Sequence, residues 1–172
     1  MPYVTRFLAL AALLLSFAPV SNAQTVTRGP YLQQASPTQM IVRWRTDVAT
    51  DSEVQYAVVN DTPAAVSSAT STTDHSVILT GLAADTFYNY TVGTTTAVLA
   101  GGDLATNGDG EHHFTTSPTG AKDTRIWVIG DSGTADANAA AVRDAYKTFT
   151  GARGTDVWLM LGDNAYNIGS DT

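Results

Sequence analysis

Between residues 25 and 114, hydrophobic and polar positions alternate in short runs separated by Asp, Thr, Ser, Pro and Gly. In the clearest run, Met40, Val42 and Trp44 occupy every second position and would share one face of an extended chain. Further runs of this kind occupy residues 53–58 and 76–79. A period of two is typical of β-strands that bury one face. The pattern therefore predicts the short strands of a β-sandwich.

The segment Leu82–Val92 has the pattern of a tyrosine corner. A leucine is followed by a turn and then by Tyr88 and Tyr90 at alternate positions. In a tyrosine corner the hydroxyl of the tyrosine bonds to backbone a few residues upstream. We therefore expect the Tyr88 hydroxyl to make such a bond, and Trp44 and Tyr88 to lie in the core.

An acidic segment, Asp103–Glu111, lacks the glycine and terminal-acid spacing of a calcium loop, so it is predicted to be a long hairpin loop. His112 and His113 follow it directly. Adjacent residues of a strand point to opposite faces, so these two imidazoles are predicted to be solvated or to lie in a turn rather than to share a metal ion.

The pattern changes after a polar linker at residues 117–123. Ile126–Ile129 and Val157–Leu161 are continuous apolar runs, which are typical of strands buried on both faces. Between them, apolar residues recur at helical spacing; they are Val142, Ala145, Tyr146 and Phe149. Asp136 or Asn138 could cap the start of this helix, and Gly151 could end it. We expect a right-handed strand–helix–strand unit whose two strands are parallel.

The first residues have the pattern of a signal peptide. Arg6 precedes an apolar run, Phe7–Phe17, and Ser21–Ala23 supplies the small residues of a cleavage site before Gln24. A run of about eleven residues is too short to span a bilayer, which needs roughly 20. The sequence predicts a secreted or periplasmic protein without a stable membrane anchor.

Three segments are thus predicted: a signal peptide at 1–23, a β-sandwich at 24–118 and the start of an α/β domain at 119–172. The composition of 44% hydrophobic and 15% charged residues suits a packed core, and the absence of cysteine excludes a disulfide scaffold. The formal net charge of −7 argues against nucleic acid as a partner. The sequence makes no prediction of the oligomeric state.

The two apolar runs of the α/β segment lead into similar Gly-Asp pairs. Gly130-Asp131 follows the first run and Gly162-Asp163 follows the second. Parallel strands end at the same edge of a sheet, so the two carboxylates should converge there, with each glycine allowing a sharp turn. Like charges at close range repel and call for bound cations, and carboxylates can bridge two metal ions. As an alternative, these aspartates could serve only as turn formers or helix caps.

The residues quoted so far resemble two known families. Trp44 and the tyrosine pattern resemble a fibronectin type III domain. The opening segment Thr27–Gln33 resembles the first strand of the sandwich that precedes the catalytic domain in purple acid phosphatases, which are calcineurin-like metallophosphoesterases. In calcineurin-like metallophosphoesterases as a whole the first motif is Asp-x-His, whereas this chain has Asp131-Ser132-Gly133. Purple acid phosphatases share that glycine and add a tyrosine in Gly-Asp-x-x-Tyr, which matches Gly162 to Tyr166.

The resemblance implies a dinuclear metal centre that hydrolyses phosphate monoesters. By resemblance, Asp131 and Tyr166 bind Fe(III), and Asp163 bridges to a divalent metal, which is Fe, Zn or Mn. The later His- and Asn-containing motifs of the family do not occur by Thr172. We therefore expect this chain to be the N-terminal portion of a longer enzyme, with the catalytic residues beyond Thr172 and little turnover by this portion alone.

Two other functions remain open. Gly130-Asp131-Ser132 also resembles the first motif of GDSL-type serine esterases, in which Ser132 would be the nucleophile while the Gly133 amide and Asn164 stabilise the oxyanion. The chain could instead be a secreted sandwich with a non-catalytic binding role. As an isolated aromatic residue, Tyr166 would more often pack in a core than bind a metal.

Overall fold

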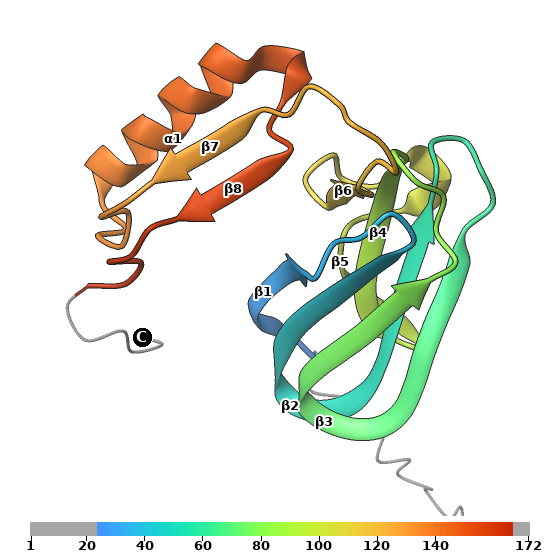
Figure 1. The fold of residues 1–172 in the computed structure, drawn as a ribbon. Helices are drawn as coiled ribbons and strands as arrows, with labels where there is room; N and C mark the ends of the chain where they lie inside the picture. The colour runs from blue at the N-terminus through green and yellow to red at the C-terminus, as the bar shows by residue number, and fades with distance from the viewer. Residues whose placement is uncertain (1–23, 167–172) are drawn as a thin grey trace, which may run out of the picture.

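The computed structural model describes residues 24–166 (Figure 1). In chain order its elements are β1 Val26–Gln33, β2 Gln39–Ala57, β3 Ala64–Thr80, β4 Phe87–Thr94, β5 Ala97–Ala100, β6 His113–Thr115, β7 Ile126–Ile129, α1 Ala137–Thr150 and β8 Val157–Met160. Two 3-10 turns, Leu104–Thr106 and Gly151–Arg153, complete the set. The first six strands form one antiparallel sheet, and β7 and β8 form a second, parallel one.

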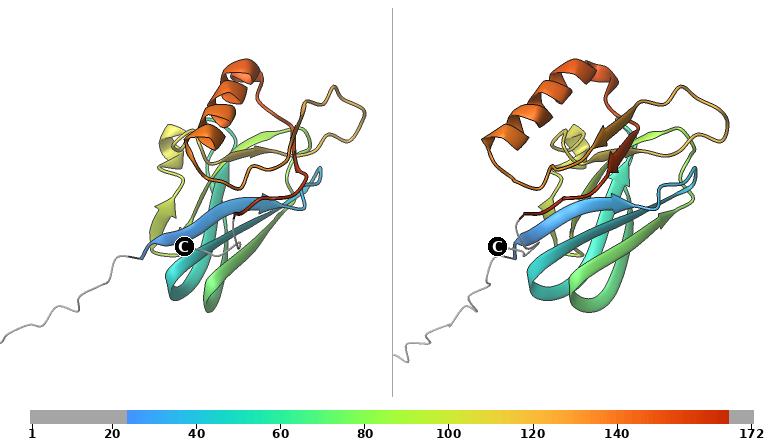
Figure 2. Two further views of the ribbon diagram at one scale, coloured as in Figure 1. Left: turned by 90° about the vertical axis from the view of Figure 1, so that its left-hand side faces the viewer. Right: turned by 60° about the vertical axis from the view of Figure 1, so that its left-hand side comes forward.

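The six-stranded sheet curls so that its two halves face each other, which makes it a β-sandwich (Figures 1 and 2). Strand β2 belongs to both halves. Its first part pairs with β1, and its last part, residues 53–57, pairs with β4. Strand β3 follows β2 along almost its full length, from Gln39↔Thr80 to Tyr56↔Ala64. The long β2–β3 hairpin therefore connects the two layers, and the predicted sandwich architecture is confirmed.

The strands of this hairpin are longer than the alternation predicts. The expected run at 76–79 is part of β3 and all but the last residue of the run at 53–58 is part of β2, and both strands continue through polar sequence. Shifts in the β2–β3 register between Arg45 and Thr50, and between Thr50 and Ser52, mark the bend. The prediction of separate short strands was wrong because backbone hydrogen bonds between β2 and β3 keep the polar stretch extended. Such bonds form whether or not the side chains are apolar, so alternation does not reveal them.

The core lies between the two layers. Its largest cluster of buried side chains comprises Met40, Val42, Trp44, Val54, Val77, Leu79, Leu82, Tyr88, Tyr90, Val92 and Phe114. The predicted inward face of the first run is confirmed, since Met40, Val42 and Trp44 are 3%, 0% and 0% exposed. The tyrosine corner is confirmed as well, because the Ala83 N–H donates to the Tyr88 hydroxyl at 3.0 Å.

The acidic segment is not a hairpin loop. Strands β5 and β6 both pair with β4, at Val92–Thr94 and at Phe87–Asn89 respectively, so they lie end to end along one edge of it. Residues 101–112 are therefore an excursion from that edge, in which Asp103 caps the first 3-10 turn. The hairpin prediction was wrong because sequence spacing cannot tell a turn between neighbouring strands from an interruption along one partner strand.

The second sheet is the predicted strand–helix–strand unit. Ile126↔Val157 to Ile129↔Met160 pair in parallel, with α1 between the two strands in sequence. The Asp136 carboxylate accepts hydrogen bonds from the backbone of Asn138 and Ala139, so Asp136, not Asn138, is the N-cap. Gly151 follows the helix as predicted, but its φ of 52° and ψ of −145° lie outside the left-handed helical conformation that a glycine at a helix end was expected to take.

Burial of these two strands differs from the prediction. Val128 and Trp158 are 53% and 54% exposed, and Phe149 on the predicted apolar side of α1 is 78% exposed. Within residues 24–166 the unit has two strands and one helix, which Figure 1 shows apart from the sandwich. Trp127 stacks on Tyr146 at 4.0 Å between ring centroids and on Trp158 at 5.2 Å. A strand is buried on both faces only where layers cover both, and here α1 supplies one.

Among the described residues, no helix has the length and apolar character needed to cross a membrane. The predicted signal peptide, residues 1–23, lies outside the described part of the chain.

Candidate metal centre

The parallel pairing of β7 and β8 continues into the turns that follow them. The Leu161 N–H donates to the Ile129 carbonyl oxygen at 2.9 Å, and the Asp131 N–H donates to the Gly162 carbonyl oxygen at 3.2 Å. Because both turns are held to each other by backbone bonds, the residues after the two strands share one edge of the sheet. This is the edge where open α/β sheets place their ligands.

Both aspartates adopt the left-handed backbone conformation. The φ angle is 54° at Asp131 and 50° at Asp163, and Gly162 before the second has φ of 128°. We expected the glycines to make the sharp turns, but the aspartates themselves take the left-handed position at both strand ends. Aspartate tolerates this conformation better than most residues, and such backbone positions cluster at functional sites.

Three oxygen-bearing side chains meet at this edge. The Tyr166 hydroxyl lies 2.7 Å from Asp131 Oδ1 and 2.5 Å from Asp163 Oδ2. A phenol has one proton, so it can donate to only one of the two carboxylates at a time. The structure thus brings together all three residues that the sequence singled out as metal ligands.

The two carboxylates hold the phenol in its protonated form. Hydrogen bonds to Asp163, and then to Asp131, raise the pKa of Tyr166 well above its ordinary value of 10. The side chain is not enclosed, since Tyr166 is 45% exposed. A cation that bound here would have to displace the phenol proton, so its affinity would increase with pH.

The donor set fits a hard metal ion. Carboxylate and phenolate oxygens are hard anionic ligands, and all three converge within hydrogen-bonding distance of one another. In residues 24–166, no group of three or more His, Cys, Asp or Glu side chains is arranged to hold a metal. A metal ion held by Asp131 and Asp163 would therefore need Tyr166 as its third donor.

The histidines take no part in this site. His75 is fully buried in the sandwich, with its ring nitrogens 2.8 Å from Thr46 Oγ1 and Ser52 Oγ. The Nδ1 atom of His112 lies 2.7 Å from Asp109 Oδ2. The buried position of His75 was not predicted, although its alternation with Val77 and Leu79 indicates an inward-facing side chain.

The groups required by the esterase alternative are arranged differently. Ser132 is partly buried between Asp131 and Gly133. The Gly133 N–H, expected to stabilise an oxyanion, instead donates to the Asp163 carbonyl oxygen at 2.9 Å. This amide is therefore engaged in holding the two turns together.

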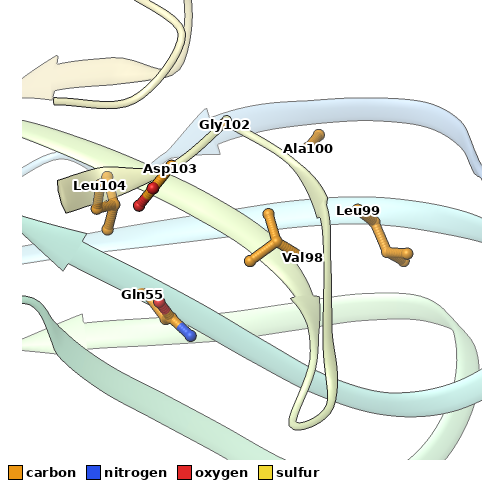
Figure 3. Close-up of a pocket in the computed structure, with 7 residues that line it drawn as sticks. All are labelled: Gln55, Val98, Leu99, Ala100, Gly102, Asp103 and Leu104. Carbon is orange, nitrogen blue, oxygen red and sulfur yellow. The ribbon is translucent and has the colours of Figure 1, made fainter. Parts of the chain in front are cut away.

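An open hollow of about 470 Å³ lies on the sandwich. It is lined by Gln55, Val98, Leu99, Ala100, Gly102, Asp103 and Leu104 (Figure 3). Its lining includes one carboxylate and none of the predicted ligands, so the candidate centre is a surface site separate from this hollow.

Comparison with known proteins places the chain in a family. The model described as "Purple acid Phosphatase, N-terminal domain" matches residues 28–116, just over half of the chain. The protein therefore belongs to the family that carries the purple acid phosphatase N-terminal domain. The matched residues correspond to the six-stranded sandwich, so membership rests on this part of the fold and not on Asp131, Asp163 or Tyr166.

One solved structure is similar in fold over most of the chain. A structure described as that of PhoD is 16% identical and aligns with a TM-score of 0.55 over 88% of this chain and 30% of its own. This chain thus spans about a third of PhoD. A redesigned β-sandwich protein, 18% identical, covers 52% of this chain and 92% of its own with a TM-score of 0.36. The sensor domain of the anti-sigma factor RsgI4 of Pseudobacteroides cellulosolvens, 13% identical, covers 60% and 99% with a TM-score of 0.31. A search of curated protein sequences finds no match.

Proposed function

We propose that the protein is a secreted, metal-dependent phosphatase of the acid phosphatase type that hydrolyses phosphate monoesters at a dinuclear centre. The observation that carries the proposal is the convergence of the Tyr166 hydroxyl on Asp131 and Asp163. Membership of the purple acid phosphatase N-terminal family supports a phosphatase relationship. Residues 1–23 support export through their signal-peptide pattern.

Each side chain has a distinct part in this proposal. Asp131 and Tyr166 would hold Fe(III), and Asp163 would bridge to a divalent Fe, Zn or Mn. When bound, such a metal pair polarises phosphoryl oxygens and lowers the pKa of a coordinated water. The two carboxylates balance the cationic charge, and the backbone bonds between their turns fix the distance between them.

The proposal is tested by adding Fe(III) to the metal-free protein and recording the visible spectrum. We expect a phenolate-to-iron charge-transfer band that is absent in Tyr166→Phe, because that variant lacks the phenolate oxygen. Asp163→Asn should weaken iron binding, since a neutral amide offers no negative charge to balance the cation. An unchanged band in Tyr166→Phe would contradict the assignment of Tyr166 as a ligand.

Ser132→Ala is the matched control for the esterase alternative. In the metal-centre proposal Ser132 only separates Asp131 from Gly133, so the variant should retain both the band and any phosphatase activity. Hydrolysis of a phosphomonoester and of a carboxylester is measured side by side, in the longest form that the reading frame encodes. Metal-independent carboxylester hydrolysis that disappears in Ser132→Ala would overturn the proposal in favour of a serine nucleophile.

A further inference from the structure

Gly133 lies where there is no room for a side chain. A Cβ atom there would be 2.5 Å from the Asn164 carbonyl carbon and 2.6 Å from the Asp163 carbonyl oxygen, and it would also collide with the Ala165 nitrogen. All three are backbone atoms of one turn, so none of them can swing aside as the end of a flexible side chain can. Gly133 does not have a positive φ, so its backbone conformation would accept other residues. Glycine is required here because a side chain has no room.

Backbone bonds hold Gly133 against both ends of that turn. Its N–H donates to the Asp163 carbonyl oxygen at 2.9 Å, and its carbonyl oxygen accepts from the Tyr166 N–H at 3.0 Å. The second bond fixes the backbone of the residue whose hydroxyl lies 2.7 Å from Asp131 Oδ1. The contact at Gly133 therefore controls how closely Tyr166 can approach Asp131.

We infer that Gly133 is a positioning residue: its missing side chain lets the 163–166 turn close on the Asp131 turn and brings Tyr166 to the metal-binding edge. The inference rests on the proposed function for the role of that edge. Any side chain at position 133, histidine included, excludes this closure.

The test compares Gly133→Ala with Gly130→Ala in the full chain. Gly130 is a matched control in the same strand-to-helix connection, since its φ is not positive and the nearest atom to an added Cβ would be Leu161 Cβ at 3.9 Å. In the metal-free protein, the amides of residues 133 and 166 should exchange with solvent at least roughly tenfold faster in Gly133→Ala, because the bonds that protect them are lost. They should be unchanged in Gly130→Ala.

Iron binding supplies a second readout. The charge-transfer band should require roughly tenfold to 100-fold more Fe(III) in Gly133→Ala, the usual effect of disturbing a group that orients a ligand. No band forms in a Tyr166→Phe background, so iron affinity is measured there by competition with a chelator; the same substitution should cost no further affinity, because Gly133 acts through Tyr166. An additive loss in that background would overturn the inference.

The remaining outcomes are also decisive. Near-ultraviolet circular dichroism reports the packing of all ordered aromatic rings, among them the stack of Trp127, Tyr146 and Trp158. A reduced signal in Gly133→Ala but not in Gly130→Ala would show a role in folding the whole unit, which overturns the inference. Unchanged amide exchange would overturn it too, even if the wild type binds iron. If the wild type forms no iron band, the proposed function fails, while faster exchange in Gly133→Ala alone would still support the positioning role.

Discussion

His75 is a titratable side chain held in the sandwich core by two hydroxyl groups. The Thr46 hydroxyl donates to the Val48 carbonyl oxygen at 2.7 Å, so it accepts from His75 Nε2–H, and Ser52 donates to Nδ1. The ring also stacks on Trp44 with centroids 4.7 Å apart. This network fits the neutral imidazole, whereas protonation would place a positive charge in a site with no exposed surface.

The stability of the sandwich should therefore decrease in mild acid. Burial lowers the pKa of His75 below 6.5, against the opposing influence of Asp74 and Asp51. The unfolded chain then binds more protons than the folded one, so this contribution is complete above about pH 6.5 and is lost as the pH falls toward the folded pKa. Between about pH 7.5 and about pH 5.5, we expect the free energy of unfolding from urea denaturation to fall by at most about 1.4 kcal/mol per pH unit from this residue.

His75→Gln is the comparison for this prediction, because glutamine can bond to hydroxyls but does not titrate. His112 and His113 are present in both proteins, so their contribution cancels. The variant should be less stable at neutral pH and should show a smaller dependence of its midpoint on pH. Equal pH dependence in the two proteins would contradict the role assigned to His75.

At the level of elements, α1 depends on its N-cap. The Asp136 carboxylate accepts from the N–H groups of Asn138 at 3.0 Å and Ala139 at 2.9 Å. Asp136→Ala should destabilise the helix by about 1 kcal/mol, because these two donors lose their partner. Amide exchange along 137–150 measures this, and Asn138→Ala, which leaves the cap intact, should change it little. A larger effect of Asn138→Ala would mean that the cap is assigned to the wrong residue.

The pairing of β7 with β8 positions the edge that carries Asp131 and Asp163, although these strands bury little. Four register pairs align Ile129 with Met160, so both chains turn at the same level. Arg125 N–H donates to Asp156 Oδ2 at 2.7 Å and its guanidinium donates to the Thr150 carbonyl oxygen at 3.1 Å, which ties the start of both strands to the end of α1. Hydrogen bonds and not apolar burial thus set this geometry.

For the whole molecule, we propose that the sandwich of residues 24–118 is the more stable unit. Its main core cluster draws only on residues within 26–114, whereas β8 is exposed throughout. An ion pair between Lys122 and Asp85 joins the linker to the sandwich, but it is solvent-exposed and contributes little. Limited proteolysis should cut within 117–125 or beyond it and leave 24–118 intact. A resistant fragment from 119 onward, with the sandwich digested, would overturn this domain assignment.

The β7–β8 sheet exposes apolar side chains that promote association between molecules. Val128, Leu159 and Leu161 are 53%, 44% and 71% exposed, and the β7–β8 sheet has open edges within the described residues. We therefore expect the protein to associate through these edges. A sheet of only two strands is also too small to be an independently stable unit.

Much of the fold and the candidate site follows from local sequence. Alternation predicts the inward face of Met40, Val42 and Trp44, because side-chain direction in a strand has a period of two. The parallel pair and the convergence of Asp131 and Asp163 follow from a strand–helix–strand pattern, which brings both strand ends to one edge. The Gly-Asp-x-x-Tyr spacing identified Tyr166 as a third residue of this site, although its role as a ligand stays a prediction.

Other features depend on contacts between residues far apart in the chain, and only the tertiary structure decides them. The bend of the β2–β3 hairpin across both layers depends on the register between these two strands. The interruption between β5 and β6 likewise depends on which residues of β4 each of them pairs with. The burial of His75 requires hydroxyls from β2, and the need for glycine at 133 comes from backbone some 30 residues later. Sequence by itself determines which residues can share a face or an edge, because that depends on local periodicity. Only packing determines how closely they approach, because that distance depends on atoms that the local pattern does not contain.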